Sequence, residues 1–315
     1  MAKKKINHYS GIGGQAVLEG VMMKNKDLYA VAVRKDNGEI AVEVDHYQGA
    51  GEKRGLMHIP FLRGVFAFWD SMVLGMKAIN FSASLYGEEE ITKQKDTIEA
   101  EKKDKILMTL TTMVSVVLAI GIFMVLPYYL SSLLDGYVRN NSLMALIEGL
   151  IRILIFIIYI LLISCMKDIR RLFAYHGAEH KCINCLERGK PLTVENVRES
   201  TRLHKRCGSS FILFVMLISI ILFFFIRVHS VPLRIVIRIL LIPVIAGIAY
   251  ELIRIAGRFD NIIVKIFSAP GLLLQRLTTK EPDDEMIEVG IKSVEAVFDW
   301  KEFLQDSFGY KFEEE

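Results

Sequence analysis

Residues 106–134 contain no charged side chain, and this run constrains the fold more than any other part of the sequence. As a helix, it is long enough to cross the ~30 Å hydrocarbon core of a bilayer. Three further apolar runs follow, at residues 143–166, 211–226 and 233–253. Because a segment in lipid must satisfy its own backbone hydrogen bonds, these runs predict four transmembrane helices.

The composition agrees with this prediction. Hydrophobic residues make up 52% of the chain, and the mean hydropathy of +0.34 is high because those residues gather in a few runs. A net charge of only +3 gives no electrostatic footprint for nucleic acid, so we expect no such partner. No apolar core of a secretory signal follows Lys3, Lys4 and Lys5, and we expect none.

Lysine and arginine are distributed unequally among the loops. Residues 167–206 carry ten of them, whereas residues 135–142 and 227–232 carry one each. Since cytoplasmic loops of membrane proteins are enriched in these residues, the count predicts both termini in the cytoplasm. The expected location is therefore the inner (plasma) membrane of the cell, with the chain crossing it several times.

The N-terminal 105 residues divide into two segments. Residues 1–59 are expected to form a cytosolic glycine-rich loop and a β-hairpin, because two β-prone runs flank Asp36-Asn37-Gly38. Residues 60–105 are expected to form an interfacial helix and a charged linker. Arg63, Asp70 and Lys77 share one face of that helix, and a span is the alternative if this face is buried in protein.

The remaining segments follow from the apolar runs. They are transmembrane helices 1–2 (106–166), a cytosolic histidine-containing segment (167–206), transmembrane helices 3–4 (207–256) and a cytosolic C-terminal region (257–315). In the last of these, apolar residues from Ile287 to Phe298 recur at helical spacing and predict a packing face. The predicted fold class is an α-helical polytopic membrane protein with about four transmembrane helices, an interfacial helix and a small N-terminal α+β cytosolic part.

The segment after the second run contains the pattern His-Gly-Ala-Glu-His. His176 and His180 are four residues apart, so on a helix both imidazoles lie on one face, with Glu179 beside them. One helix commonly supplies two nitrogens to a zinc ion in this way, and in one class of zinc peptidases the glutamate is the general base. The alternative is that both histidines extend to the headgroup layer.

A second polar cluster precedes the third run and contains His204 and Cys207. The two spans flanking the intervening loop are antiparallel, so their cytoplasmic ends can meet. We therefore predict a divalent metal site, zinc by preference, held by His176, His180, His204 and Cys207. Three histidines with an open position would make the site catalytic, whereas a closed site that includes the cysteine would be structural.

Other polar residues are weaker candidates. Cys182 and Cys185 form a single Cys-x-x-Cys, which we interpret as small buried thiols. Glu251 could ligate or orient the histidines, because an acid within a span is a functional candidate. Glu19 could reach the site if the N-terminal part folds over it, although a turn is the simpler interpretation. Four further residues lie near the ends of spans: we expect Glu148 to pair with Arg152, and Arg234 and Arg238 to extend to the interface.

Five blocks in order resemble the YqhQ-like family of bacterial membrane proteins, and the match extends over nearly the whole chain. The blocks are Gly13–Met23, Pro60–Gly64, His176–Lys181, His204–Phe211 and Ala269–Pro282. The family has no established function and is usually described as predicted metal-dependent enzymes. The resemblance therefore implies a membrane location and the histidine site, without a reaction and without a role for the cysteine pair.

Taken together, these patterns favour a metal-dependent integral membrane enzyme, with hydrolysis of a peptide or lipid-linked substrate as the reaction considered first. Glu179 would be the base. The alternative is a membrane scaffold or assembly factor in which the metal only joins two helices. A di-iron oxidase needs more clustered histidines than this chain offers, and a transporter is disfavoured because no internal repeat is evident. The substrate and oligomeric state are not readable from the sequence, nor are the roles of Glu19, Glu251, Cys182 and Cys185.

Overall fold

The computed structural model describes residues 8–53, 55–86, 98–134, 136–226, 231–258 and 261–312. The chain divides into two compact units. The first combines residues 1–86, 164–213 and 246–315, and the second combines residues 87–163 and 214–245. Three separate stretches of sequence therefore build the first unit.

The N-terminal part of the first unit is a four-stranded antiparallel sheet in the order β1-β2-β3-β4. Its strands are β1 (Gly13–Val17), β2 (Gly20–Asn25), β3 (Leu28–Arg34) and β4 (Ile40–His46). The hairpin predicted around Asp36-Asn37-Gly38 is confirmed as β3–β4. The expected glycine-rich loop is wrong, because most of it forms β1 and β2 around a tight turn in which Glu19 takes a left-handed backbone (φ 47°).

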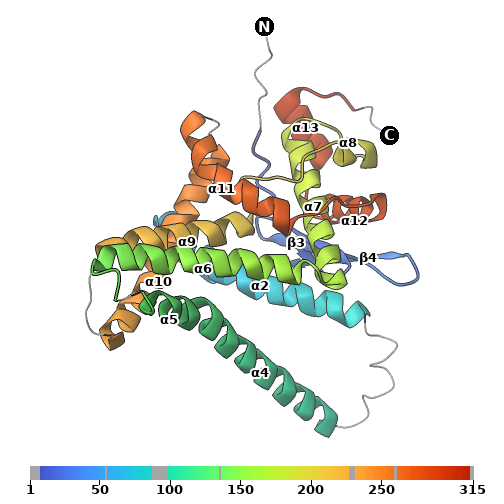
Figure 1. The fold of residues 1–315 in the computed structure, drawn as a ribbon. Helices are drawn as coiled ribbons and strands as arrows, with labels where there is room; N and C mark the ends of the chain where they lie inside the picture. Colours follow the sequence, from blue (N-terminus) through green and yellow to red (C-terminus); the bar gives the residue numbers. More distant parts are fainter. Residues whose placement is uncertain are drawn as a thin grey trace. The chain divides into compact units, whose positions relative to one another are not determined.

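Both faces of this sheet are covered by helices, and alternate residues point to opposite faces (Figure 1). On one face Val21 and Met23 pack in the same core as α7 (Lys167–Glu187) and α12 (Asp284–Glu295). On the other, Val31 and Val33 pack with Leu74 of α2 (Leu62–Tyr86). Side chains of β3 point alternately to the two faces, and both faces are buried, which explains why β3 is almost wholly apolar.

The helix α2 is the predicted interfacial helix, and its polar face is engaged by protein groups. It follows α1 (Ala50–Lys53) and a 3₁₀ turn, η1 (Leu56–His58). Asp70 accepts hydrogen bonds from the Ala50 N–H at 2.9 Å and the Tyr47 hydroxyl at 3.2 Å. Arg63 donates to Glu251 at 2.6 Å. The helix is confirmed, and its depth in a membrane stays a prediction.

The rest of the first unit is helical. It contains α8 (Val194–Arg198), α11 (Ile262–Thr278) and α13 (Trp300–Phe308), with the first turns of α9 (Gly208–Phe225) and the last turns of α10 (Val231–Arg258). The predicted packing face near the C-terminus is confirmed, since Ile287, Ile291 and Val294 of α12 are buried in the core with α7 and the sheet.

The second unit contains α4 (Ile98–Ile120), a π-helical turn η2 (Gly121–Val125), α5 (Leu126–Ser132) and α6 (Asn141–Ile163), with the remaining parts of α9 and α10. Residues 98–105 of the expected charged linker belong to α4, and residues 87–97 lie outside the described residues. Figure 1 shows α4 and α5 following one another along a nearly continuous path.

A buried charge cluster lies within this second unit. The expected pair is confirmed, because Arg152 donates to Glu148 at 2.7 Å. Arg238 also binds Glu148, at 2.7 Å, so the expectation that it extends to the interface is wrong. The side chain of Arg234 is outside those that the structure describes.

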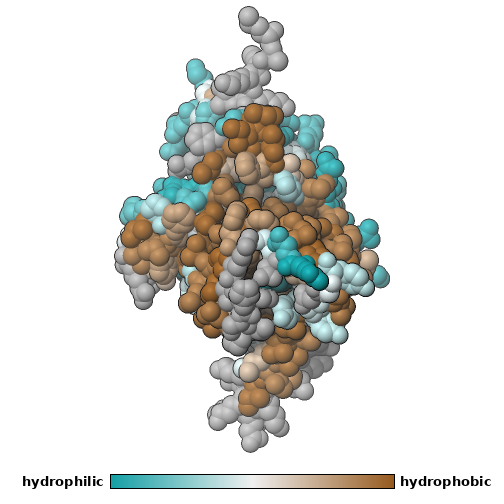
Figure 2. Space-filling view, turned by 60° about the vertical axis from the view of Figure 1, so that its left-hand side comes forward, coloured by the Kyte–Doolittle hydropathy of each residue, from teal (hydrophilic) through white to brown (hydrophobic). Residues whose placement is uncertain are grey.

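Among the residues that the structure describes, four helical stretches are long and apolar enough to cross a membrane, as predicted. They are Thr109–Ser132, Ser142–Ile163, Gly208–Phe225 and Val236–Gly257. Figure 2 shows hydrophobic side chains gathered over much of the visible face, which an aqueous surface would disfavour. By length and composition, the chain is thus a candidate membrane protein.

Candidate metal centre

The histidine-containing segment begins with the 21-residue helix α7, which ends at Glu187, two residues before a glycine. Gly189 takes a left-handed backbone (φ 71°), and its N–H donates to the Leu186 carbonyl at 2.9 Å. Glycine suits this position because it has no Cβ to clash. From Ala174 to the end of α7 every residue except His176 is buried. The two histidines therefore face a protein interior and do not extend to a headgroup layer.

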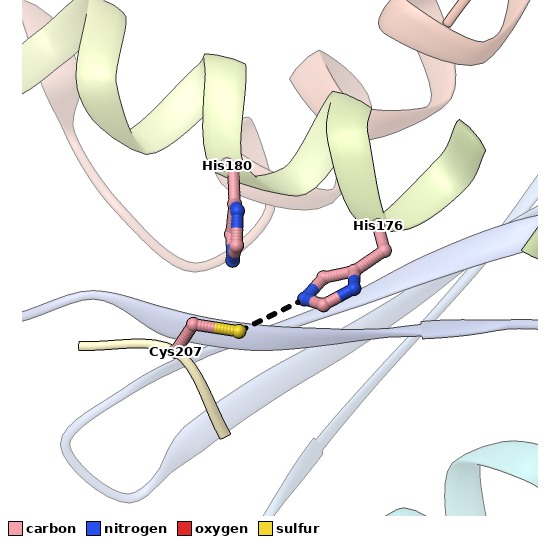
Figure 3. Close-up of side chains that lie close together, drawn as sticks. All are labelled: His176, His180 and Cys207. Atoms are coloured by element: carbon pink, nitrogen blue, oxygen red, sulfur yellow. Dashed lines mark hydrogen bonds between the residues drawn. The ribbon is translucent and has the colours of Figure 1, made fainter. Parts of the chain in front are cut away.

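Three side chains converge at the centre of the first unit. The ligand atoms of His176, His180 and Cys207 all lie within 4.8 Å of one another. Both imidazoles leave α7 on the same side, and the Cys207 sulfur comes from the turn before α9 to meet them (Figure 3). In a tetrahedral zinc site the ligand atoms are about 3.3–3.8 Å apart, so small adjustments would satisfy an ion.

A main-chain carbonyl fixes the tautomer of each of the two clustered histidines. The Nδ1 atom of His176 lies 2.9 Å from the Thr278 carbonyl, and that of His180 lies 2.6 Å from the Arg202 carbonyl. A carbonyl only accepts, so each Nδ1 carries the proton and each Nε2 keeps its lone pair. Protein metal sites orient histidine ligands in this way.

The thiol of Cys207 completes the cluster from another element. Its sulfur is 3.2 Å from Nε2 of His176, and because that nitrogen is the acceptor, the thiol is the donor. The Ser209 N–H donates to the same sulfur at 3.3 Å. Cys207 stands directly before α9, where backbone N–H groups favour negative charge. The donor set of two nitrogens and one sulfur is one that zinc accepts.

The carboxyl of Glu179 lies against both histidines. Its Oε2 is 3.8 Å from Nε2 of His176 and 3.9 Å from Nε2 of His180. Glu179 is only 5% exposed, and burial raises its pKa to about 7, with His176 opposing the shift. Strand β1 approaches it closely, since a Cβ on Gly14 would meet Cγ of Glu179 at 3.1 Å. The arrangement can hold and release a proton beside the cluster.

The fourth predicted ligand, His204, lies next to the cluster but outside the three-residue group. Its ring centroid is 5.6 Å from that of His180, and its Nε2 is 3.7 Å from Glu187. Burial lowers the pKa of His204 to about 4, so the ring is neutral. Burial opposes the charge on Glu187, but His204 and Arg206 outweigh it and lower that pKa to about 2. Coordination by His204 stays a prediction.

Gln275 was not among the predicted site residues, although it connects α11 to the main chain of His204. The side chain of Gln275, on α11, is fully buried and bonds the main chain of His204 twice, at 2.8 and 2.7 Å. It also donates to the Ser210 hydroxyl at 2.8 Å. Two signals were available: Gln275 lies in the block Ala269–Pro282 that carries the family resemblance, and with Thr278 it shares the buried face of an amphipathic helix.

Three of the weaker candidates lie outside the three-residue cluster. Cys182 and Cys185 are buried thiols, as expected, and burial raises the pKa of Cys185 to about 11. Glu251 binds Arg63, and a role for it in ligating or orienting the histidines stays a prediction.

Glu19 does come back to α7. It binds Arg171, and it accepts a hydrogen bond from the Tyr175 hydroxyl at 3.2 Å. Both partners belong to the turn of α7 before His176. Glu19 therefore lies in a turn, as the simpler interpretation predicted. It also joins the β1–β2 turn to the helix that carries His176 and His180.

Comparison with known proteins places the chain in a family. A family model described as a protein of unknown function, DUF1385, matches residues 59–300, which include α7, Cys207 and Gln275. The chain is 36% identical over 300 residues to the uncharacterized protein YqhQ of Bacillus subtilis (strain 168), and the match covers 93% of each. No solved structure matches. The chain is therefore a member of the DUF1385 family, and is similar over nearly its whole length to YqhQ.

Proposed function

We propose that this chain is a metal-dependent integral membrane enzyme whose site faces the cytoplasm, and that it catalyses a hydrolysis. One observation carries the proposal: His176, His180 and Cys207 converge with the carboxyl of Glu179 beside them. Three protein donors leave one position of a tetrahedral ion open to water or substrate, which distinguishes catalytic zinc sites from structural ones.

The side chains at this site are suited to binding a metal ion. The Nε2 lone pairs of His176 and His180 are oriented by carbonyls, and the Cys207 thiol loses its proton when a metal takes its place. A bound divalent ion would supply Lewis acidity to polarise a carbonyl and acidify a water. Zinc is the preferred metal because it accepts mixed nitrogen and sulfur donors.

Glu179 is proposed as the general base. Its Oε2 lies 3.8 Å from Nε2 of His176 and 3.9 Å from Nε2 of His180, so it would stand beside a water held by an ion at this site. In that place it can take a proton from an attacking water and return it to a leaving group. The burial of the site limits access by bulk water, which favours a substrate that enters from the membrane, such as a membrane protein or a lipid-linked molecule.

A structural metal is the second candidate, and the position of His204 favours it. The ring of His204 is 5.6 Å from that of His180, so a rotation away from Glu187 would offer a fourth protein ligand. A site closed in this way would join α7 to the start of α9 and would have no open position. The protein would then be a membrane scaffold or assembly factor.

Metal analysis of the purified full chain tests the ligand set. We expect about one zinc per chain in the wild type, and loss of it in His176→Ala, His180→Ala and Cys207→Ser. Glu179→Gln should keep the metal, since it preserves the shape of the side chain. His46→Ala is the matched control, because His46 is exposed on β4. Normal zinc content in both clustered-histidine variants would refute the site.

Cobalt substitution and X-ray absorption separate the two functions. A cobalt-loaded protein should show a sulfur-to-metal charge-transfer band that Cys207→Ser abolishes. Zinc absorption spectra should fit one sulfur, two imidazoles and one further light-atom neighbour from solvent for the enzyme. Three imidazoles and one sulfur, reduced to two imidazoles in His204→Ala, would identify the scaffold instead.

A further inference from the structure

A cavity of about 550 Å³ opens beside the first two turns of α7, separate from the histidine cluster. Four cationic side chains line it: Lys167, Arg170 and Arg171 from α7, and Lys280 from the segment after α11. Residues three and four apart on a helix share a face, so the three from α7 point to the same side. The Lys280 N–H donates to the Phe173 carbonyl at 2.8 Å, which holds that segment against the helix.

The positive charge in this cavity is only partly neutralised. The guanidinium of Arg171 is already taken by Glu19. Glu281 also lines the cavity, but its carboxylate binds Lys181 at 2.8 Å and Arg202 at 2.9 Å. For the other three cations no ion pair occurs among the residues that the structure describes. The cavity therefore has an excess of donors for an anion.

The sequence connects both sides of the cavity to membrane-associated segments. Only three residues separate Lys167 from Ile163, the last residue of a candidate span. Even fully extended, that connection measures about 15 Å or less. On the other side, α11 buries Val264, Leu274 and Gln275 while it exposes large apolar side chains to its surroundings. These are Ile262, Ile263, Ile266, Phe267 and Leu273.

An amphipathic helix with such an exposed apolar face is typical of the membrane interface. The cations at the end of α11 and at the start of α7 then lie at headgroup depth. Clusters of lysine and arginine next to a span attract anionic lipids, and arginine binds phosphate oxygens through two parallel hydrogen bonds.

We propose that this cavity binds a phosphate-bearing anion, and that the anion is the headgroup of an acidic phospholipid. Lys167, Arg170 and Lys280 hold the phosphate, while Arg171 is kept in place by Glu19. The site does not depend on the metal cluster or on the proposed hydrolysis. A soluble phosphate ester shares the same chemistry, and the experiment below separates the two sources.

The test uses the purified full chain in an uncharged detergent and titration calorimetry with four probes. The probes are dioctanoyl phosphatidylglycerol, dioctanoyl phosphatidylcholine, glycerol 3-phosphate and inorganic phosphate. The test variant is Lys167→Gln/Arg170→Gln, and the matched control is Arg188→Gln/Lys301→Gln. Each pair removes one lysine and one arginine, all four exposed, and the control pair lies outside the cavity.

We expect phosphatidylglycerol to bind the wild type and the control equally, and to bind the test variant about tenfold more weakly or worse. Phosphatidylcholine should not bind, because its headgroup has no net charge. Lys280→Gln should weaken binding as well, which provides a second variant on another element. Added salt should weaken the binding too, because the cations are partly exposed.

Several results would change the conclusion, in different ways. Glycerol 3-phosphate or inorganic phosphate that binds as tightly as phosphatidylglycerol, with the same dependence on Lys167 and Arg170, would assign the cavity to a soluble phosphate. Equal phosphatidylglycerol affinity in wild type and test variant, or equal loss in the control, would overturn the site. Binding of phosphatidylcholine with the same affinity would overturn it as well.

Discussion

Gly177 lies between the two clustered histidines, where α7 touches the segment that follows α11. A Cβ at this position would stand 2.0 Å from the Lys280 carbonyl oxygen, which is main chain and has little freedom to move. The same contact region contains Thr278, whose carbonyl orients His176. The absence of a side chain at Gly177 thus determines how closely the orienting carbonyl can approach the histidine.

Gly177→Ala is therefore expected to destabilise the protein, although alanine favours helices. Helix propensity alone would stabilise the variant by about 1 kcal/mol, whereas forcing a methyl group into a filled space costs about 1–3 kcal/mol or more. We expect a lower thermal unfolding midpoint in the same detergent. Gly13→Ala is the control, since nothing lies within 4 Å of its Cβ position. Equal midpoints for the two variants would contradict the prediction.

At the residue scale, part of the candidate site was predictable from spacing. The i,i+4 histidines and the glutamate between them follow from helical geometry, and the structure places all three as that geometry requires. The carbonyls of Thr278 and Arg202 were not predictable, because every residue has one. The position of Gln275 depends on tertiary packing, which periodicity alone does not specify.

At the scale of elements, the largest difference from the sequence analysis is the β1–β2 hairpin. Glycine is depleted in strands, so the stretch from Gly11 to Val21 predicted a loop. The structure uses two of these glycines for close approach: a Cβ on Gly14 would meet the Met22 carbonyl, and one on Gly20 would meet the Ala32 carbonyl. The β3–β4 hairpin was predictable, because Asp-Asn-Gly has a known turn preference.

Within the second unit, Glu148 is the only acidic residue among the described side chains that faces Arg152 and Arg238. Arg152 also donates to the Phe123 carbonyl at 3.0 Å, in the π-helical turn η2. A π-helical turn leaves a carbonyl without its usual helical partner, and here Arg152 binds it. The charge cluster therefore connects α6 and α10 to the irregular part of the first candidate span. Two cations and one anion form this network, in which both arginines bind the same carboxylate.

The network predicts unequal effects of removing its charges. Glu148→Gln leaves two buried arginines without a counter-charge, and we expect it to cost about 3 kcal/mol. Arg238→Gln leaves the neutral pair of Glu148 and Arg152, so its cost should be smaller. Thermal unfolding and the yield of protein in the membrane fraction measure both, with the exposed Glu302→Gln as control. If both cluster variants behaved like this control, the network would have no stabilising role.

At the scale of the whole molecule, the four candidate spans were predictable because length and the absence of charge are properties of sequence alone. The predicted boundaries agree with those of the candidate spans to within a few residues at all four. How residues 1–86, 164–213 and 246–315 assemble into one unit was not predictable. That assembly depends on packing between stretches far apart in sequence, such as β2 with α12.

The orientation of the candidate spans in the membrane is the last prediction for the whole molecule. Labelling of cysteine thiols can measure it. Cys182 is fully buried and would resist a reagent on either side, so it is uninformative. Cys165 is exposed and follows Ile163, the last residue of the second span, by two positions. Tyr137, between the first two spans, is 88% exposed.

With both termini in the cytoplasm, a membrane-impermeant maleimide added to intact cells should leave Cys165 unlabelled until the cells are permeabilised. In a Cys165→Ser background, Tyr137→Cys should be labelled from outside, because an odd number of crossings separates the two positions. Measuring both thiols also controls for differences in reactivity with the maleimide, since each is expected to be accessible from one side of the membrane. Labelling of Cys165 but not of residue 137 in intact cells would invert the topology and place the histidine cluster on the outer face.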